Sequence, residues 1–147
     1  MLQEIVASTT LMSASVAVHA GGSMVIFTWL ERVVPERLER MSKLHNLALL
    51  ISLFLVILAL HVIEITLWAF FYDYVDCFDD FKTSLYYSFT AYTTTGFGDV
   101  VLPRQWQLVG AIEGCVGILL FGWSTAFTWA FIHQFLTERH RRSRQGE

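Results

Sequence analysis

Residues 79–99 read DDFKTSLYYSFTAYTTTGFGD, and this stretch decides the fold. Asp79 and Asp80 precede a run of mostly aromatic and small hydroxyl residues, which is typical of a helix that begins after an aspartate cap. The sequence therefore predicts a helix over residues 80–92. At ~1.5 Å per residue such a helix is about 18 Å long, too short to cross a ~30 Å hydrocarbon core.

Two long apolar blocks flank this short helix. Among Asp, Glu, Lys and Arg, residues 44–71 contain only Glu64, and residues 106–136 contain only Glu113. Each block exceeds the ~20 residues that a membrane-spanning helix needs. Because the helix between them is too short to cross, the sequence predicts a segment that enters the membrane and leaves on the same side.

A third uncharged block occupies residues 5–30, and the residues before it lack the positive region of a signal peptide. We therefore expect a further membrane-spanning helix over residues 1–31. Overall, 54% of residues are hydrophobic and 16% are charged, which argues against an ordinary soluble enzyme. The chain shows no nucleophile and base pair and no phosphate-binding loop. We expect no enzymatic activity, no nucleic-acid partner and no small-molecule substrate.

The positive charges predict the orientation of the chain in the membrane. Eight of the ten Lys and Arg residues lie in residues 32–43, which we expect to form a cytoplasmic amphipathic linker, or in residues 137–147, a basic tail. Short positive segments stay in the cytoplasm, so we expect the C-terminus inside and the N-terminus outside the plasma membrane, the inner membrane in a bacterium. The tail either contacts anionic lipid head groups or is solvated.

The order of these elements, with TTGFG at residues 94–98, resembles the pore of the two-helix potassium channels and their TVGYG selectivity filter. Small bacterial channel-like proteins with an extra N-terminal helix are similar. The resemblance implies an all-α membrane protein with three transmembrane helices, a re-entrant pore helix and a filter loop, assembled as a homotetramer. Its pore domain covers residues 44–136, with an outer helix at 44–71, a pore helix at 80–92, a filter at 94–99 and an inner helix at 106–136.

In such a filter, backbone carbonyls replace the hydration shell of the ion. The resemblance implies that K⁺ is the permeant ion, with no cofactor, and that Gly98 completes the ion-binding segment whose ligands are the carbonyls of Thr94, Thr95, Gly96 and Phe97 and the Thr94 hydroxyl. Gly96 and Gly98 are expected at positive φ, which glycine reaches without steric strain. Because one chain supplies one strand, a ring of four requires four chains.

The sequence departs from the family in the residues that brace the filter. Thr95 replaces the usual Val or Ile, and Phe97 replaces the usual Tyr, so Phe97 has no hydroxyl to donate. A potassium-selective channel is the leading interpretation. The alternatives are a weakly selective monovalent cation channel and a non-conducting membrane subunit. The residues expected to support the filter are Thr93, Asp99, Tyr87, Thr90 and Glu113.

Glu113 is a carboxylate in a membrane helix, and such groups face protein or water. It lies about two turns inside the outer end of its block, level with the predicted pore helix. One interpretation is that Glu113 braces that helix by accepting hydrogen bonds from Ser88 or Thr90. The other is that it is protonated and packed between helices.

Polar residues also interrupt the first two blocks. His61, Glu64 and Trp68 share one helix face, and His19 lies near the middle of the first block. These residues form either a buried proton sensor or a structural hydrogen-bond cluster that holds the first helix against the second.

The inner helix is expected to line a cavity and to form a hydrophobic gate. Gly117 serves there either as a hinge or as a packing position. Outside the membrane, four aspartates, at positions 73, 76, 79 and 80, favour a vestibule that concentrates cations over a calcium site. The cavity and gate residues implied by the alignment on Gly117 are Ile118, Phe121, Thr125 and Trp129.

Overall fold

The computed structural model describes residues 1–33 and 43–145, which form four α-helices and one short 3₁₀ helix. Three of them contain apolar stretches long enough to cross a membrane, at Leu2–Leu30, Asn46–Tyr74 and Arg104–His133. For the described residues, the prediction of an all-helical chain with three candidate spans is confirmed. In chain order the elements are α1 (Leu2–Val33), α2 (Lys43–Tyr74), α3 (Phe81–Tyr92), η1 (Arg104–Trp106) and α4 (Gln107–Gln145).

Some boundaries differ from those expected. α2 continues about a turn beyond residue 71, and α4 continues beyond residue 136 to Gln145, so most of the predicted tail belongs to the last helix. Residues 137–145 contain no Gly or Pro that would end the helix. The amphipathic character predicted for the linker falls mainly on residues 34–42, which lie outside the described residues.

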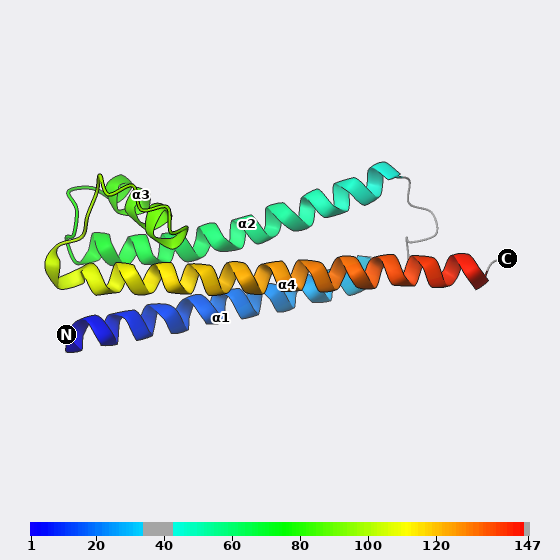
Figure 1. The fold of residues 1–147 in the computed structure, drawn as a ribbon, viewed down its shortest axis with the longest axis horizontal. Helices are drawn as coiled ribbons and strands as arrows, with labels where there is room; N and C mark the ends of the chain where they lie inside the picture. Colours follow the sequence, from blue (N-terminus) through cyan, green and yellow to red (C-terminus); the bar gives the residue numbers. More distant parts are fainter. Residues whose placement is uncertain (34–42, 146–147) are drawn as a thin grey trace.

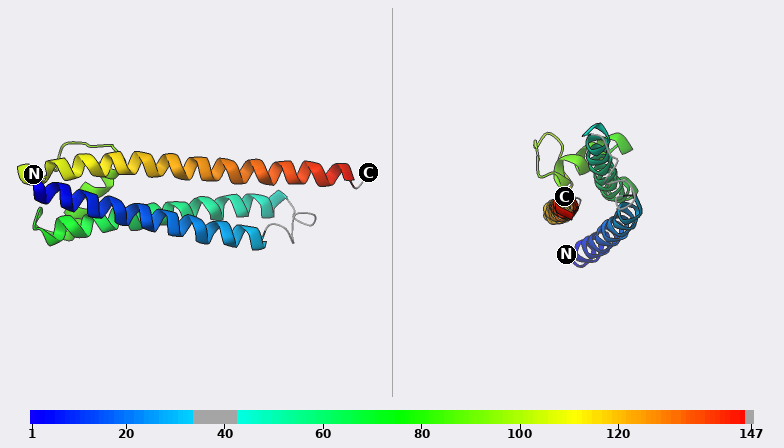
Figure 2. Two further views of the ribbon diagram at one scale, coloured as in Figure 1. Left: turned by 90° about the horizontal axis from the view of Figure 1, so that it is seen from below. Right: turned by 90° about the vertical axis from the view of Figure 1, so that its right-hand side faces the viewer.

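The long helices α1, α2 and α4 run lengthwise through the molecule, and Figure 1 shows the N-terminus at the end where α3 lies. The chain leaves α2 at this end, passes through α3 and returns to the same end before α4 begins. The end-on view in Figure 2 shows α3 and its following loop on one side of α2 and α4, and α1 on the other side. α3 packs against α2 and α4, and α1 packs against the same two helices.

The buried side chains form two hydrophobic clusters. Ile26 and Leu30 of α1 pack against Leu49 and Leu53 of α2 in the smaller one. The larger cluster joins α2, α3 and α4 around Trp68, whose indole Nε1 donates to Ser15 Oγ of α1 at 3.0 Å. Many large apolar side chains of the long helices are exposed, which fits contact with lipid.

Candidate functional site

The N-terminus of α3 is fixed by the expected aspartate cap. The backbone N–H of Thr83 donates to Asp80 Oδ1 at 2.8 Å, and its hydroxyl donates to Oδ2 at 2.9 Å. The helix begins one residue after the cap, at Phe81. These hydrogen bonds, the backbone one first, hold the pKa of Asp80 below its ordinary value. The cap therefore keeps its negative charge in mild acid.

Beyond α3 the chain turns back along the helix. The backbone N–H of Thr94 donates to Ala91 O at 2.9 Å, and that of Gly96 donates to Thr90 O at 3.1 Å. The φ angles are +57° at Thr94, +48° at Gly96 and +78° at Gly98. Positive φ at both glycines was predicted and is confirmed. Positive φ at Thr94 was not expected, because a side chain disfavours this conformation.

The segment after α3, residues 93–99, lies on the surface of the chain. All seven residues are exposed, and the Phe97 side chain is 71% exposed, whereas Tyr92 just before them is fully buried. The Thr93 hydroxyl donates to Phe89 O at 2.6 Å and lies 2.9 Å from the Thr95 hydroxyl. One threonine thus ties this segment to α3.

The outer end of the segment is held by a residue that sequence reasoning missed. The Tyr86 hydroxyl donates to Asp99 Oδ2 at 2.7 Å, and this bond is the first cause that raises the pKa of Tyr86. Asp99 Oδ1 also accepts from the N–H of Val100 at 3.1 Å. Since Phe97 has no hydroxyl, the bond from Tyr86 provides a brace from α3 by another route. The sequence shows a pair of tyrosines in α3, but it does not show which of the two faces Asp99.

Two of the residues expected to support the filter, Tyr87 and Thr90, make contacts among the helices. The Tyr87 ring packs against Tyr72 and Phe78, and burial raises its pKa to about 12. The Thr90 hydroxyl donates to Tyr87 O at 2.9 Å, within α3, so of the two residues expected to contact Glu113 the structure selects Ser88. Thr90 contributes to the following segment through its carbonyl, which accepts from the N–H of Gly96.

Glu113 links three helices from a fully buried position. Its Oε2 accepts from the Tyr72 hydroxyl of α2 at 2.7 Å, and its Oε1 contacts Ser88 Oγ of α3. The expected contact with Ser88 is present. Ser88 Oγ also lies 2.8 Å from Ile65 O, and a hydroxyl has one hydrogen. A protonated Glu113 that donates to Ser88 satisfies both contacts. Glu113 then still links α4 to α3, but as a donor to Ser88 rather than as the expected acceptor.

α3 packs closely against α4 at two glycines. A Cβ atom on Gly117 would lie 2.0 Å from Tyr92 O, and one on Gly114 would lie 3.1 Å from Ala91 O. In this conformation Gly117 is therefore a packing position. The four residues expected to line a cavity are exposed and share one face of α4, and the Phe121 ring at the edge of this face also contacts Tyr92. They are Ile118, Phe121, Thr125 and Trp129.

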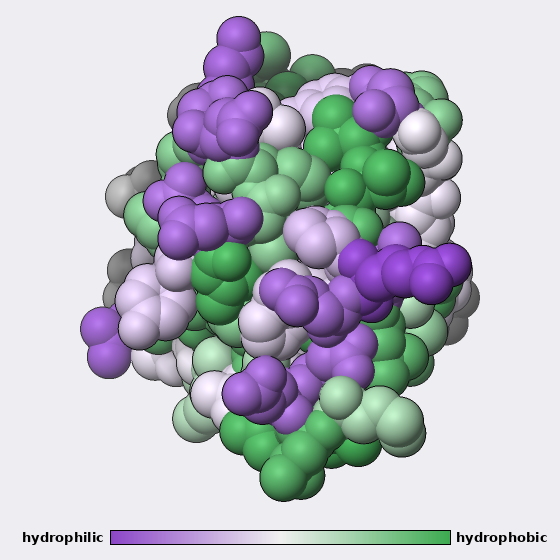
Figure 3. All heavy atoms as spheres, turned by 90° about the vertical axis from the view of Figure 1, so that its left-hand side faces the viewer, coloured by the Kyte–Doolittle hydropathy of each residue, from purple (hydrophilic) through white to green (hydrophobic). Residues whose placement is uncertain are grey.

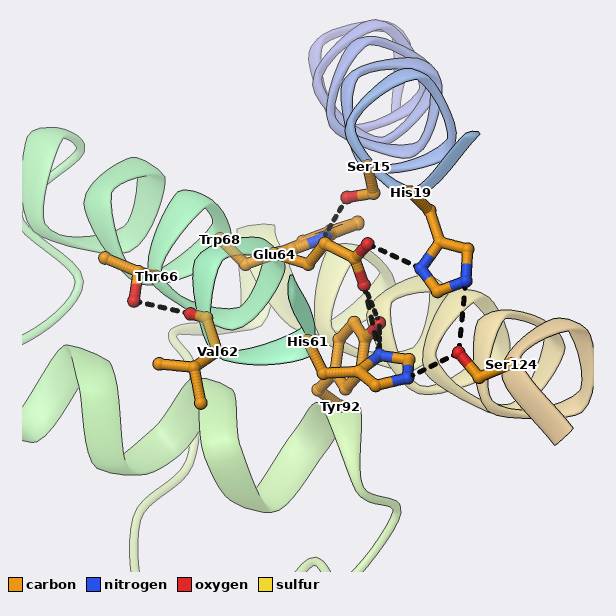
Figure 4. A network of polar contacts seen from close by, with 9 residues as sticks. All are labelled: Ser15, His19, His61, Val62, Glu64, Thr66, Trp68, Tyr92 and Ser124. Carbon is orange, nitrogen blue, oxygen red and sulfur yellow. Dashed lines mark hydrogen bonds and ion pairs between the residues drawn. The ribbon is translucent and has the colours of Figure 1, made fainter. Parts of the chain in front are cut away.

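At the C-terminal end of α3, five polar side chains from all four α-helices meet (Figure 4). We call this group the His–Glu cluster; it consists of His19, His61, Glu64, Tyr92 and Ser124. His19 Nδ1 lies 2.8 Å from Glu64 Oε1, and His61 Nδ1 lies 3.2 Å from Glu64 Oε2. The Tyr92 hydroxyl donates to Glu64 Oε2 and lies 3.0 Å from His61 Nδ1. Ser124 Oγ lies 3.0 Å from His61 Nε2 and 3.1 Å from His19 Nε2. The expected contact between the first and second helices is confirmed, and it also includes α3 and α4.

Metal-ligating side chains occur together in this cluster. Among the described residues, His19, His61 and Glu64 offer ligand atoms within 4.8 Å of one another. Both Glu64 oxygens are already hydrogen-bonded, Oε2 to the Tyr92 hydroxyl and Oε1 to His19 Nδ1, and His61 Nδ1 also faces Oε2. The atoms that would bind a metal are thus hydrogen-bonded to one another in this structure.

The end of the molecule that carries α3 exposes polar groups among apolar ones (Figure 3). Asp76, Asp79 and Asp80 are exposed there, and Asp73 is half-buried. Cys77, a free thiol, is half-buried beside them, and burial raises its pKa to about 11. It is therefore a protonated, weakly nucleophilic thiol at neutral pH.

The comparisons with known proteins place this arrangement in a class. Residues 49–134, more than half of the chain, match a family model described as ion channel. The chain therefore belongs to this ion-channel family, and with its three apolar helices it is a membrane protein. The matched region runs from α2 through α3 and the exposed segment into α4, and α1 lies outside it. Searches of curated proteins and of solved structures gave no match.

Proposed function

We propose that the protein is a potassium channel in which four copies arrange residues 94–98 around one axis, so that their carbonyls replace the hydration shell of K⁺. Thr94, Thr95, Gly96 and Phe97 supply the carbonyl ligands. The inner helices, α4, surround the ion path below this filter. The N-terminus and the filter face the outside, and the basic end of α4 lies in the cytoplasm among the anionic lipid head groups.

The observation that carries this proposal is the alternation of φ along the segment. φ is positive at Thr94, Gly96 and Gly98 and not at the residues between them. In a regular strand successive carbonyls point to opposite sides, whereas this alternation turns successive peptide groups toward the same side. A row of carbonyls on one side of a strand suits a dehydrated cation.

Two further features support a shared axis. The filter segment is exposed in the single chain, and one strand supplies only a quarter of a four-fold ring. The C-terminal end of α3, where the helix dipole is negative, points into the bundle rather than toward the outer end (Figure 1). A negative helix end below the filter favours a cation there.

Cation uptake into liposomes that hold the purified full chain tests the proposal. We expect uptake of rubidium and potassium to exceed uptake of sodium. Gly96→Ala should lower potassium uptake roughly tenfold, because a side chain at positive φ costs about 1–2 kcal/mol. No neighbouring atom lies within 4 Å of a Cβ at Gly96, so the change tests conformation rather than space.

Gly21→Ala is the matched control, since a Cβ on Gly21 also has no neighbour within 4 Å and its φ is not positive. Equal sodium and potassium uptake would favour the weakly selective cation channel, and no uptake would favour the non-conducting subunit. Native mass spectrometry of the protein in detergent should give the mass of four chains. A stable monomer would contradict the shared filter.

The brace from Tyr86 to Asp99 leads to a separate prediction. Tyr86→Phe removes the hydroxyl that holds the outer end of the filter, so we expect potassium-over-sodium uptake to fall roughly two- to tenfold. Tyr74→Phe, which removes a hydroxyl from an exposed tyrosine at the same end, should leave the ratio unchanged. Equal ratios in the two variants would exclude a role for this bond in selectivity.

A further inference from the structure

The His–Glu cluster lies at the end of α3, next to the start of the proposed filter. Tyr92 is the last residue of α3, and the first carbonyl ligand of the proposed filter follows two residues later. The histidines and Glu64 are at most 3% exposed, and Tyr92 is fully buried. A change in this cluster therefore acts on α3 at the point where the filter begins.

The hydrogen bonds of the cluster require five hydrogens. If Glu64 is ionised and both histidines are neutral, the side chains supply only four. Hydrogens are required between His19 and Glu64, between Tyr92 and Glu64, and between Ser124 and each of the two histidines. A fifth, on His61 Nδ1, serves both Glu64 and Tyr92. Each neutral histidine and each hydroxyl brings one hydrogen, which makes four. Without a fifth, two acceptor atoms face each other.

The fifth hydrogen also makes the cluster electrically neutral. With an ionised Glu64 and two neutral histidines the cluster carries a charge of −1, and one added proton makes it neutral. A net charge buried in a membrane protein is strongly unfavourable. The hydrogen count and the charge therefore lead to the same protonation state.

We propose that the His–Glu cluster holds one exchangeable proton, shared between Glu64 and the two histidines, and that this proton positions Tyr92 and the start of the filter. His19 is then a positioning residue, supplied by the helix that lies outside the channel-family match. The effect on conduction rests on the proposed function, whereas the proton itself does not.

The titratable groups of the cluster come from three of the helices that pack around it. The elements packed against it contribute His19 from α1, His61 and Glu64 from α2, and Tyr92 from α3. From α4 come Ser124 and two aromatic rings, with Trp123 edge-on to His19 and Phe121 beside His61. Glu113, the other buried carboxylate of the described residues, is bonded to Ser88 and Tyr72 instead. A divalent metal would leave the cluster with a charge of +1, so a proton suits it better.

Potassium uptake measured between about pH 5 and about pH 9 tests the proposal. In the wild type we expect one transition, with uptake at least roughly threefold lower on the alkaline side, where the fifth hydrogen is lost. Glu64→Gln and His19→Gln should give flat profiles. Ser15→Ala, which removes a different contact between α1 and α2, should keep the transition. A flat wild-type profile, or the same transition in Glu64→Gln, would overturn the positioning role.

Nitrogen NMR of ¹⁵N-histidine-labelled protein reads the proton without conduction. At neutral pH we expect the spectrum to show one of two states. Either the pair His19 and His61 shares one extra proton, or Glu64 carries it and His19 is neutral and protonated at Nε2. This proton should be lost over the same pH range as the transition in uptake. Tyr92→Phe should keep the histidine titration while uptake no longer follows it. Two neutral Nδ1-protonated histidines at every pH, or a stoichiometric metal in the purified protein, would overturn the proposal. Absence of uptake with an intact titration would overturn only the proposed function.

Discussion

Replacing Gly117 by alanine is expected to lower the free energy of unfolding by about 3 kcal/mol, because overpacking against a rigid neighbour is strongly destabilising. The added Cβ would lie 2.0 Å from the carbonyl oxygen of Tyr92 and 2.9 Å from its carbonyl carbon. These are backbone atoms at the end of α3, so they cannot rotate away as a flexible side chain would. α3 must move away from α4, and the filter that follows it must move as well.

The other glycines provide a graded series for this experiment. At Gly114 the Cβ would lie 3.1 Å from Ala91 O, so a smaller loss is expected, and Gly21→Ala should not destabilise the protein. Unfolding of the purified protein in detergent, followed by the fluorescence of its five tryptophans, gives the three free energies. If Gly117→Ala were as stable as Gly21→Ala, α3 would not contact α4 as described.

The sequence predicted the features whose signal is local. The three membrane helices follow from uncharged blocks, because a spanning helix must be apolar along its whole length. The start of α3 follows from Asp80, since a cap needs only a side chain three residues before the N–H that it binds. Positive φ at Gly96 and Gly98 follows from the freedom of glycine.

The features that were missed depend on how the helices dock. Tyr86 and Tyr87 are neighbours in α3, and only the rotation of that helix decides that Tyr86 reaches Asp99 while Tyr87 packs against Tyr72. The histidines and Glu64 were expected to meet, but Tyr92 and Ser124 were not. Ser124 is 105 residues from His19 in the chain, so no local pattern joins them.

Glu113→Ala is expected to destabilise the protein by about 4 kcal/mol. The change removes the common partner of Tyr72 and Ser88, and a buried polar group left without a partner costs roughly 1–3 kcal/mol. It also leaves a cavity where α2, α3 and α4 meet. Because Ser88 still reaches Ile65 O, the larger part of the loss falls on Tyr72.

Glu113→Gln is the matched variant, and it separates the two charge states of the carboxyl group. A glutamine amide donates to Ser88 Oγ and accepts from Tyr72, as a protonated glutamic acid does. We therefore expect an unfolding free energy within about 1 kcal/mol of the wild type, with potassium uptake retained. If glutamine were as destabilising as alanine, the site would require an ionised carboxylate. Ser88 would then donate to Glu113, and the carbonyl of Ile65 would lose its hydrogen bond from Ser88.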